Sequence, residues 1–262
     1  MSNIIAVSNQ KGGVGKTTSV INLAHALSLN DKKVLIIDAD PQHNATITLS
    51  KIPPYDHPLT IIDLFTEDEL NFSRVSTETR IKNVDLIPSH LDLCYFKNQL
   101  HGSPSGMVGL KEKYDNDARK NYDYIFIDTP PDLGGPMINN ALCCADFYVI
   151  PIKAEDYYAL KGMQQLNKSI SEIKKSINKN LKFLGVIITM ADTRTKMTNT
   201  MISGIRKFFG EKVFNTTITG NTAINQATAS QKSIIEYDRR QHGAKNYIEL
   251  AKEIENRISS QK

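Results

Sequence analysis

The sequence is poor in the features that mark secreted, disulfide-bonded or membrane-spanning proteins. It has no tryptophan and three cysteines, Cys94 and the adjacent Cys143 and Cys144, which form neither a C-x-x-C pair nor an even set for disulfides. No apolar run approaches the ~18 residues of a membrane span, and residues 1–8 lack the charged start of a signal peptide. We therefore expect a cytoplasmic protein whose cysteines are small buried apolar residues.

Net charge is also low, but it is unevenly distributed. The chain of 262 residues carries +4 overall. Residues 1–152 have 13 basic and 18 acidic side chains, a net −5, whereas residues 153–262 have 19 and 10, a net +9. This distribution predicts that the C-terminal part offers a surface to a polyanion, although solvated helix faces give the same lysine excess in many proteins.

Short apolar runs alternate with helical patterns along the chain. Buried strands are predicted at 3–8, 33–40, 84–89, 122–131, 146–152 and 181–190. Helices are predicted at 17–30, 107–120, 134–145, 157–177, 196–209 and 244–258. The alternation indicates an α/β fold, a mostly parallel twisted sheet with helices on both faces, and no linker divides residues 1–262, so we expect one domain. Ligands of such folds bind beyond the carboxyl ends of the strands.

Residues 51–80 are the least regular part of the sequence. They contain Pro53, Pro54 and Pro58 among scattered charges. Because proline ends helices and interrupts strands, we expect a variable surface excursion there.

Residues 8–19, SNQKGGVGKTTS, nearly match the phosphate-binding pattern G-x-x-x-x-G-K-[ST] and lie between a predicted strand and a predicted helix. Glycines let the backbone N–H groups approach an anion, Lys16 would reach the β- and γ-phosphates, and the Thr17 hydroxyl would bind Mg²⁺. The loop residues assigned to the nucleotide site are Lys11, Gly12, Gly13, Val14, Gly15, Lys16, Thr17 and Thr18. The pattern therefore predicts a nucleoside triphosphate and Mg²⁺ at this loop.

The loop departs from the pattern at one position. Gln10 stands where the first glycine belongs, and the next residue is a second lysine, Lys11. Hydrolysis needs additional positive charge at the γ-phosphate, and no arginine near the loop supplies it within the chain.

Carboxylates close two of the predicted strands. Asp128 ends the run YIFID and is followed by Thr129-Pro130-Pro131, which suits a carboxylate that holds a metal through water. Asp38 and Asp40 close another strand. For Asp38 a cap of the following turn explains the residue equally well.

Three motifs in this order resemble those of the ParA/Soj-type partition ATPases, relatives of MinD. KGGVGKTT at 11–18 resembles their deviant Walker A motif, DADPQHNAT at 38–46 their Walker A′ or switch I motif, and DTPPDLGG at 128–135 their Walker B motif. The similarity continues through 157–166, 185–195, 209–218 and 233–254.

The resemblance implies roles for particular residues. Lys11 matches the signature lysine that crosses the interface of an ATP-sandwich homodimer and contacts the partner's phosphates, so Lys11, Lys16 and Asp40 are the expected catalytic residues. Asp40 matches the carboxylate associated with activating the attacking water, and Thr17, Asp40 and Asp128 are expected at the metal. Met190 and Asn221 are expected near adenine.

The resemblance also implies a cycle and its partners. Such proteins bind DNA without sequence specificity as ATP dimers on the nucleoid, and a ParB-like partner stimulates hydrolysis and release, which segregates a plasmid or a chromosome origin. The phosphate-loop strand starts at residue 3, so we expect no N-terminal helix-turn-helix extension.

The resemblance to the family is weaker at the residues expected to contact DNA. Arg194 matches a DNA-contacting arginine of the family, but Gly220 and Ala223 replace two others. Either Arg194 acts together with the other basic residues of the C-terminal part, or DNA binding is weak. The candidate DNA-binding residues are Arg194, Lys196, Arg206, Lys207, Lys232, Arg239 and Arg240.

Four alternatives remain open. A MinD-like membrane or positioning ATPase would need a basic amphipathic C-terminal helix, whereas the predicted helix 244–258 has a glutamate-rich polar face and an apolar stripe suited to packing on the sheet. A nitrogenase-reductase or iron–sulfur carrier would need spaced cysteines, and Cys143 and Cys144 are adjacent. The chain could also be a nucleotide-dependent scaffold that hardly turns over, or position a protein cargo.

Overall fold

A computed structural model describes residues 2–103, 105–132, 134–156, 168 and 170–261. The strands are β1 (Asn3–Val7), β2 (Val34–Asp38), β3 (Thr77–Glu78), β4 (Val84–Ile87), β5 (Tyr124–Asp128), β6 (Phe147–Lys153), β7 (Lys182–Ala191) and β8 (Val213–Thr219). The helices are α1 (Lys16–Ser28), α2 (Asn44–Leu49), α3 (Asp63–Thr66), α4 (Phe72–Val75), α5 (Leu93–Gln99), α6 (Ser105–Glu112), α7 (Asn116–Asn121), α8 (Pro136–Cys144), α10 (Lys196–Phe209), α11 (Thr222–Ala229), α12 (Ile234–Asp238) and α13 (His242–Ser259). Short 3₁₀ turns lie at Pro54–Asp56 and Gly210–Lys212.

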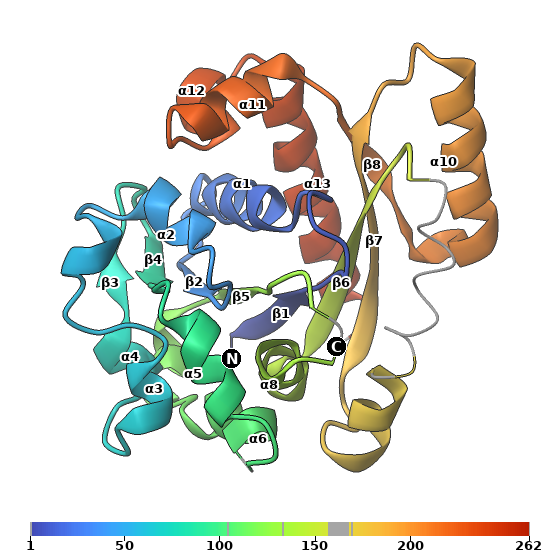
Figure 1. Ribbon diagram of the computed structural model, residues 1–262. Coiled ribbons are helices and arrows are strands. Elements are labelled where there is room, and N and C mark those ends of the chain that lie inside the picture. Colours follow the sequence, from blue (N-terminus) through green and yellow to red (C-terminus); the bar gives the residue numbers. More distant parts are fainter. Residues whose placement is uncertain (1, 104, 133, 157–167, 169, 262) are drawn as a thin grey trace.

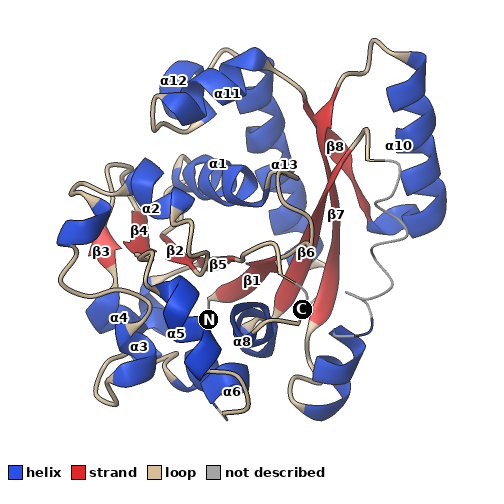
Figure 2. Ribbon diagram, viewed as in Figure 1, coloured by secondary structure: helices blue, strands red, loops and turns tan. Residues whose placement is uncertain are grey.

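One sheet of eight strands runs through the molecule in the order β3-β4-β2-β5-β1-β6-β7-β8 (Figures 1 and 2). All neighbouring strands are parallel except β3 and β4, which are antiparallel. This confirms the predicted α/β fold with a mostly parallel sheet. Because β1, β2 and β5 are neighbours and parallel, the loops that follow them meet at one edge of the sheet.

The two faces of the sheet bury separate sets of side chains, as the two-residue period of a strand requires. In β5, Ile125 and Ile127 pack with α8 and the α3–α6 region, whereas Tyr124 and Phe126 pack against α1 and α13. Figure 1 shows α1, α11, α12 and α13 on one side of the sheet and α5, α6 and α8 on the other. The last helix is α13, and its predicted apolar stripe is buried on the face of the sheet that α1 covers.

Several predictions of local structure are wrong in detail. The helix predicted at 107–120 is broken into α6 and α7, and β3 and β8 are strands that the periodicity did not indicate. The helix predicted at 157–177 lies largely outside the described residues. Cys94 is half-buried, whereas Cys143 and Cys144 are buried as expected.

Residues 51–80 are not merely the surface excursion that their composition suggests. Ile61, Leu64 and Phe72 of this segment are fully buried in the core below β2 and β5. Leu64 lies in the short helix α3 and Phe72 in α4, whereas the three prolines lie before α3.

His25 of α1 is half-buried against the start of α12, with its Nδ1 2.6 Å from the Ser233 hydroxyl that caps this helix. Burial, and secondly the nearby Arg239 charge, lower the pKa of His25 to about 4. Below pH ~6.5 the unfolded chain therefore binds a proton that the folded chain refuses, and folding stability falls as the pH drops from ~6.5 towards 4.

We expect His25→Gln to remove this dependence. The free energy of unfolding, measured by urea denaturation between pH 7 and pH 4.5, should fall by about 2 kcal/mol less in the variant than in the native chain. Replacement of the exposed His101 by glutamine is the matched control. Equal pH slopes in the two variants would contradict the assignment.

Candidate nucleotide-binding site

The loop between β1 and α1 is shaped for an anion. Gly13 and Gly15 have positive φ angles of 69° and 85°, a conformation that other residues adopt only with strain. The Thr189 hydroxyl of β7 donates to the Val14 carbonyl oxygen at 2.8 Å and holds the loop against the sheet. The loop thus leads directly into the N-terminus of α1, where backbone N–H groups are available.

Lys16 lies inside this loop with 6% of its surface exposed. Its Nζ donates to the Lys11 carbonyl oxygen at 3.0 Å, so the lysine curls back over the loop. Burial lowers the pKa of Lys16, whereas the charges of Asp128 and Asp40 raise it. The cation is therefore held beside two carboxylates.

Lys11 points to a carboxylate that the sequence did not indicate. Its Nζ lies 2.6 Å from both carboxylate oxygens of Asp156, which follows β6. Both side chains are partly buried, with 32% of Lys11 and 16% of Asp156 exposed. In a single chain, Lys11 is thus held by its own Asp156.

Asp38 and Asp128 are both completely buried at the ends of neighbouring strands β2 and β5. Asp38 accepts hydrogen bonds from the amide and hydroxyl of Thr46 in α2 at 2.8 and 2.7 Å, and from the Asp40 amide in the turn that follows β2 at 3.3 Å. Neither oxygen of Asp128 accepts a well-aligned hydrogen bond from the described residues. The Thr17 hydroxyl is nevertheless near enough to lower the pKa of Asp128. Burial raises the pKa of both carboxyl groups, and neighbouring charge adds to the effect: the charge of Asp40 acts on Asp38, and the charges of Asp38 and Asp40 act on Asp128.

The unpartnered oxygens of Asp128 fit a metal ion bound nearby. Thr17 and Asp40 both line the cleft in front of the loop. No cluster of three or more His, Cys, Asp or Glu residues suited to a metal occurs in the described ranges. Mg²⁺ usually takes few protein ligands and fills its shell with phosphate and water oxygens.

A cleft runs along the loop in two connected parts. One part, of about 410 Å³, is lined by the phosphate loop, Asp40 and Lys232. The other, of about 330 Å³, is lined by Met190, Asn221 and the end of β8. Gly15, Thr18 and Met190 border both. Met190 and Asn221, expected near adenine, thus lie together beyond the phosphate loop.

Asn221 and Met190 have constrained conformations. The Asn221 side-chain oxygen caps α11 by accepting from the Ala223 amide at 2.9 Å. Met190 has a φ of 53°, an unusual value for a residue inside a strand. Both residues therefore shape this end of the cleft through the backbone as well as through their side chains.

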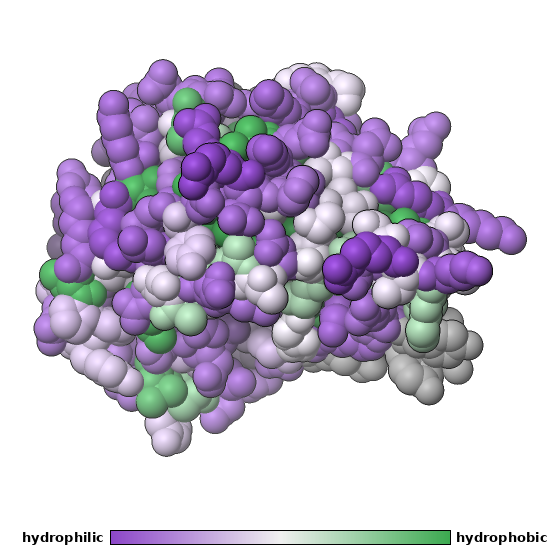
Figure 3. All heavy atoms as spheres, turned by 90° about the horizontal axis from the view of Figure 1, so that it is seen from above, coloured by the Kyte–Doolittle hydropathy of each residue, from purple (hydrophilic) through white to green (hydrophobic). Residues whose placement is uncertain are grey.

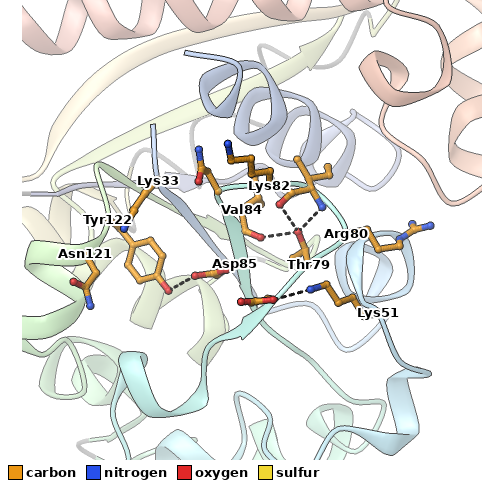
Figure 4. A pocket seen from close by; sticks show the side chains of 12 residues that line it. Lys33, Lys51, Thr79, Arg80, Lys82, Val84, Asp85, Asn121 and Tyr122 are labelled. Carbon is orange, nitrogen blue, oxygen red and sulfur yellow. Dashed lines mark hydrogen bonds and ion pairs between the residues drawn. The ribbon is translucent and has the colours of Figure 1, made fainter. Parts of the chain in front are cut away.

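A cavity larger than either part of this cleft lies elsewhere. It measures about 630 Å³ and opens beside the start of β4, away from every predicted site residue (Figure 4). Its charges are partly neutralised internally, since Lys51 pairs with Glu78 at 2.7 Å and the Tyr122 hydroxyl donates to Asp85 at 2.7 Å. Size alone therefore does not identify the functional site.

The candidate DNA-binding residues do not form one cluster. Lys196, Arg206 and Lys207 lie on α10, Arg194 just before it, and Arg239 and Arg240 follow α12. Lys232 instead lines the phosphate part of the cleft. Figure 3 shows a mostly hydrophilic face over the upper helices of Figure 1.

Some of these cations already have partners. Arg194 is 88% exposed and pairs with Asp192 at 2.8 Å, Arg240 pairs with Asp238, and Arg206 donates to the Asn215 carbonyl oxygen of β8. Lys196 and Lys207 make no ion pair within the described ranges and are exposed on α10. In the part of the chain that the structure describes, no helix is long and apolar enough to cross a membrane.

Comparison with known proteins agrees with these features. Residues 2–183 match the family described as "AAA domain". The chain is 40% identical to the sporulation initiation inhibitor protein Soj of Bacillus subtilis, over 97% of this chain and 98% of that protein. It is 36% identical to the chromosome-partitioning ATPase Soj of Treponema pallidum, over 97% of each.

A solved structure with bound nucleotide has a similar fold. Cobyrinic acid a,c-diamide synthase of Mycobacterium smegmatis, with bound ADP and magnesium, superimposes with a TM-score of 0.84 at 26% identity over 100% of this chain and 97% of the other. The phosphate loop, the strand-end carboxylates and the near-complete match to Soj agree. The chain belongs to the ParA/Soj family of chromosome-partitioning ATPases.

Proposed function

We propose that this chain, acting as one domain, hydrolyses ATP with Mg²⁺ in a sandwich homodimer and binds DNA without sequence specificity while ATP is bound. A ParB-like partner would stimulate hydrolysis and release the protein, so that a plasmid or chromosome origin is segregated on the nucleoid. The observation that carries the ATPase assignment is Lys16, which is buried beside Asp40 and Asp128 at the mouth of an open cleft.

The residues divide the work by position. Backbone N–H groups of Gly12–Thr18 and the Lys16 ammonium bind the phosphates, and Thr17 and Asp128 hold Mg²⁺, which neutralises phosphate charge when bound. Asp40 orients and deprotonates the attacking water, while Lys11 of the second copy stabilises the charge that develops at the γ-phosphate. Met190 and Asn221 border the base.

We expect Asp40→Ala to trap an ATP-loaded dimer. Asp40 lines the phosphate cleft but is not a phosphate-binding cation, so its loss should lower the rate of phosphate release about 100-fold while ATP binding persists. Gel filtration with Mg-ATP would show a dimer that no longer decays to monomer. A variant that hydrolyses ATP at the native rate would contradict the role of Asp40, and a native chain that releases no phosphate with or without a partner would indicate a scaffold.

We expect DNA binding to depend on α10. The double variant Lys196→Glu and Lys207→Glu reverses two exposed charges on this helix. Its affinity for plain plasmid DNA with ATP should fall about tenfold or more at moderate salt, and the slope of log affinity against log salt should become shallower by about 2.

The matched control reverses Lys33 and Lys82, two exposed lysines that line the distant cavity of Figure 4. An unchanged affinity and salt slope in the α10 variant would remove α10 from the DNA surface. Sedimentation with liposomes in place of DNA tests the MinD-like alternative.

A further inference from the structure

Three rings from separate segments meet beside the loop that carries Asp40. The ring of Tyr55 lies edge-on to His43, with centroids 6.1 Å apart, and edge-on to His90, with centroids 5.1 Å apart. His43 follows β2, His90 follows β4, and Tyr55 lies in the irregular segment before α3. The separations and angles are those of favourable aromatic pairs.

The segment that presents Tyr55 is closed on itself. The Ser50 hydroxyl donates to the Ile52 carbonyl oxygen at 2.7 Å and lies 2.8 Å from His57 Nε2, so one side chain joins the two ends of residues 50–57. Pro53 and Pro54 restrict the backbone between them, and the Asp56 amide donates to the Pro53 carbonyl oxygen. Tyr55 is therefore held at the tip of a small stiff loop.

Both histidines stand next to groups that fix the Asp40 backbone. The His43 amide donates to the Asp40 carbonyl oxygen at 2.8 Å, and the hydroxyl of Ser89, the neighbour of His90, donates to the same oxygen at 2.9 Å. Because Tyr55 contacts both histidine rings, it links the two segments whose hydrogen bonds hold the Asp40 carbonyl oxygen.

His43 itself is in a conformation that needs support. Its φ is 41°, in the left-handed region, and its own side chain makes no capping hydrogen bond to the helix α2 that it precedes. Its Nδ1 lies 2.9 Å from the Pro41 carbonyl oxygen, and the residue is buried. The ring contacts and this hydrogen bond hold a strained residue three positions past the catalytic candidate Asp40.

Tyr55 is 64% exposed, and its hydroxyl makes no hydrogen bond to the described residues, so neither burial nor its polar group explains its placement. We propose that Tyr55, wedged between His43 and His90, is a positioning residue that fixes the Asp40 loop for attack on ATP. This inference rests on the proposed function, because it acts through Asp40.

The test compares ATP hydrolysis by the full chain and three variants. Tyr55→Ala is expected to lower kcat about tenfold and leave KM within twofold, because the phosphate loop is untouched and only the water-orienting carboxylate loses its fixed place. Tyr55→Phe keeps the ring and should behave as the native chain. Tyr95→Ala is the matched control, an exposed tyrosine (71%) that takes no part in the three-ring contact.

A native kcat in Tyr55→Ala, or a KM that rises in step with the loss of kcat, would overturn the proposal. A second measurement does not depend on hydrolysis. Hydrogen exchange of the Gln42 and His43 amides in the nucleotide-free chain should quicken in Tyr55→Ala and not in Tyr95→Ala, and unchanged exchange would overturn the positioning role. Absence of ATP hydrolysis in the native chain would instead refute the proposed function.

Discussion

Replacement of Lys16 by alanine is expected to abolish ATP binding. Lys16 is the cation buried at the base of the phosphate loop. Its charged neighbours Asp128 and Asp40 are carboxylates, so they cannot replace its positive charge. Charge-assisted hydrogen bonds to a phosphate contribute about 1.5–3 kcal/mol each, and without the ammonium the buried carboxylates also repel the nucleotide. Affinity should fall about 100-fold or more.

Titration calorimetry with Mg-ATP measures this loss. Lys82→Ala is the matched control, because Lys82 is exposed and lines the cavity far from the phosphate loop. Thermal unfolding of the nucleotide-free variant checks that it is folded. An affinity within threefold of the native value would show that the cleft does not bind ATP through this loop.

Replacement of Lys11 by alanine is expected to leave ATP binding within about threefold and prevent ATP-dependent dimerisation. In the single chain, Lys11 is not directed at its own phosphate cleft but is bound by Asp156 at 2.6 Å. If Lys11 crosses to a second copy, this ion pair has to break, and the charge then stabilises both the dimer and the γ-phosphate. A dimer that lacks both crossing lysines should be weakened about 100-fold or more.

Asp156→Asn tests the other partner of this ion pair by itself. It retains Lys11 but removes the charge that holds it within the chain, so this variant should form the ATP dimer at least as readily as the native protein. Analytical ultracentrifugation with a non-hydrolysable ATP analogue compares the three proteins. A Lys11→Ala protein that still dimerises would refute the contribution of Lys11 across the interface.

Much of the nucleotide site follows from local sequence. The phosphate loop lies in a continuous stretch between β1 and α1, and its glycines, Lys16 and Thr17 keep their spacing whatever surrounds them. Asp128 and Asp38 were identifiable because each ends a continuously apolar strand. Since parallel strands end at one edge of a sheet, the alternation of strands and helices also predicted that these groups meet.

The contacts between distant segments could not be predicted in this way. Asp156 is 145 residues from Lys11 and carries no signal of its own in the sequence. Residues 51–80 were expected at the surface because their prolines dominate the pattern, yet Phe72 is in the core and Tyr55 contacts two histidines. Lys232 was grouped with other surface cations, although it lines the phosphate cleft.

The sequence by itself determined the fold class, the loop that cradles an anion and the carboxylates at the strand ends, because periodicity and short motifs act over a few neighbouring residues. Only the tertiary structure decided which side chains complete the site. Packing brings Asp156 to Lys11 and places Tyr55 between His43 and His90. Such pairings depend on the summed geometry of many elements, and no local pattern records that geometry.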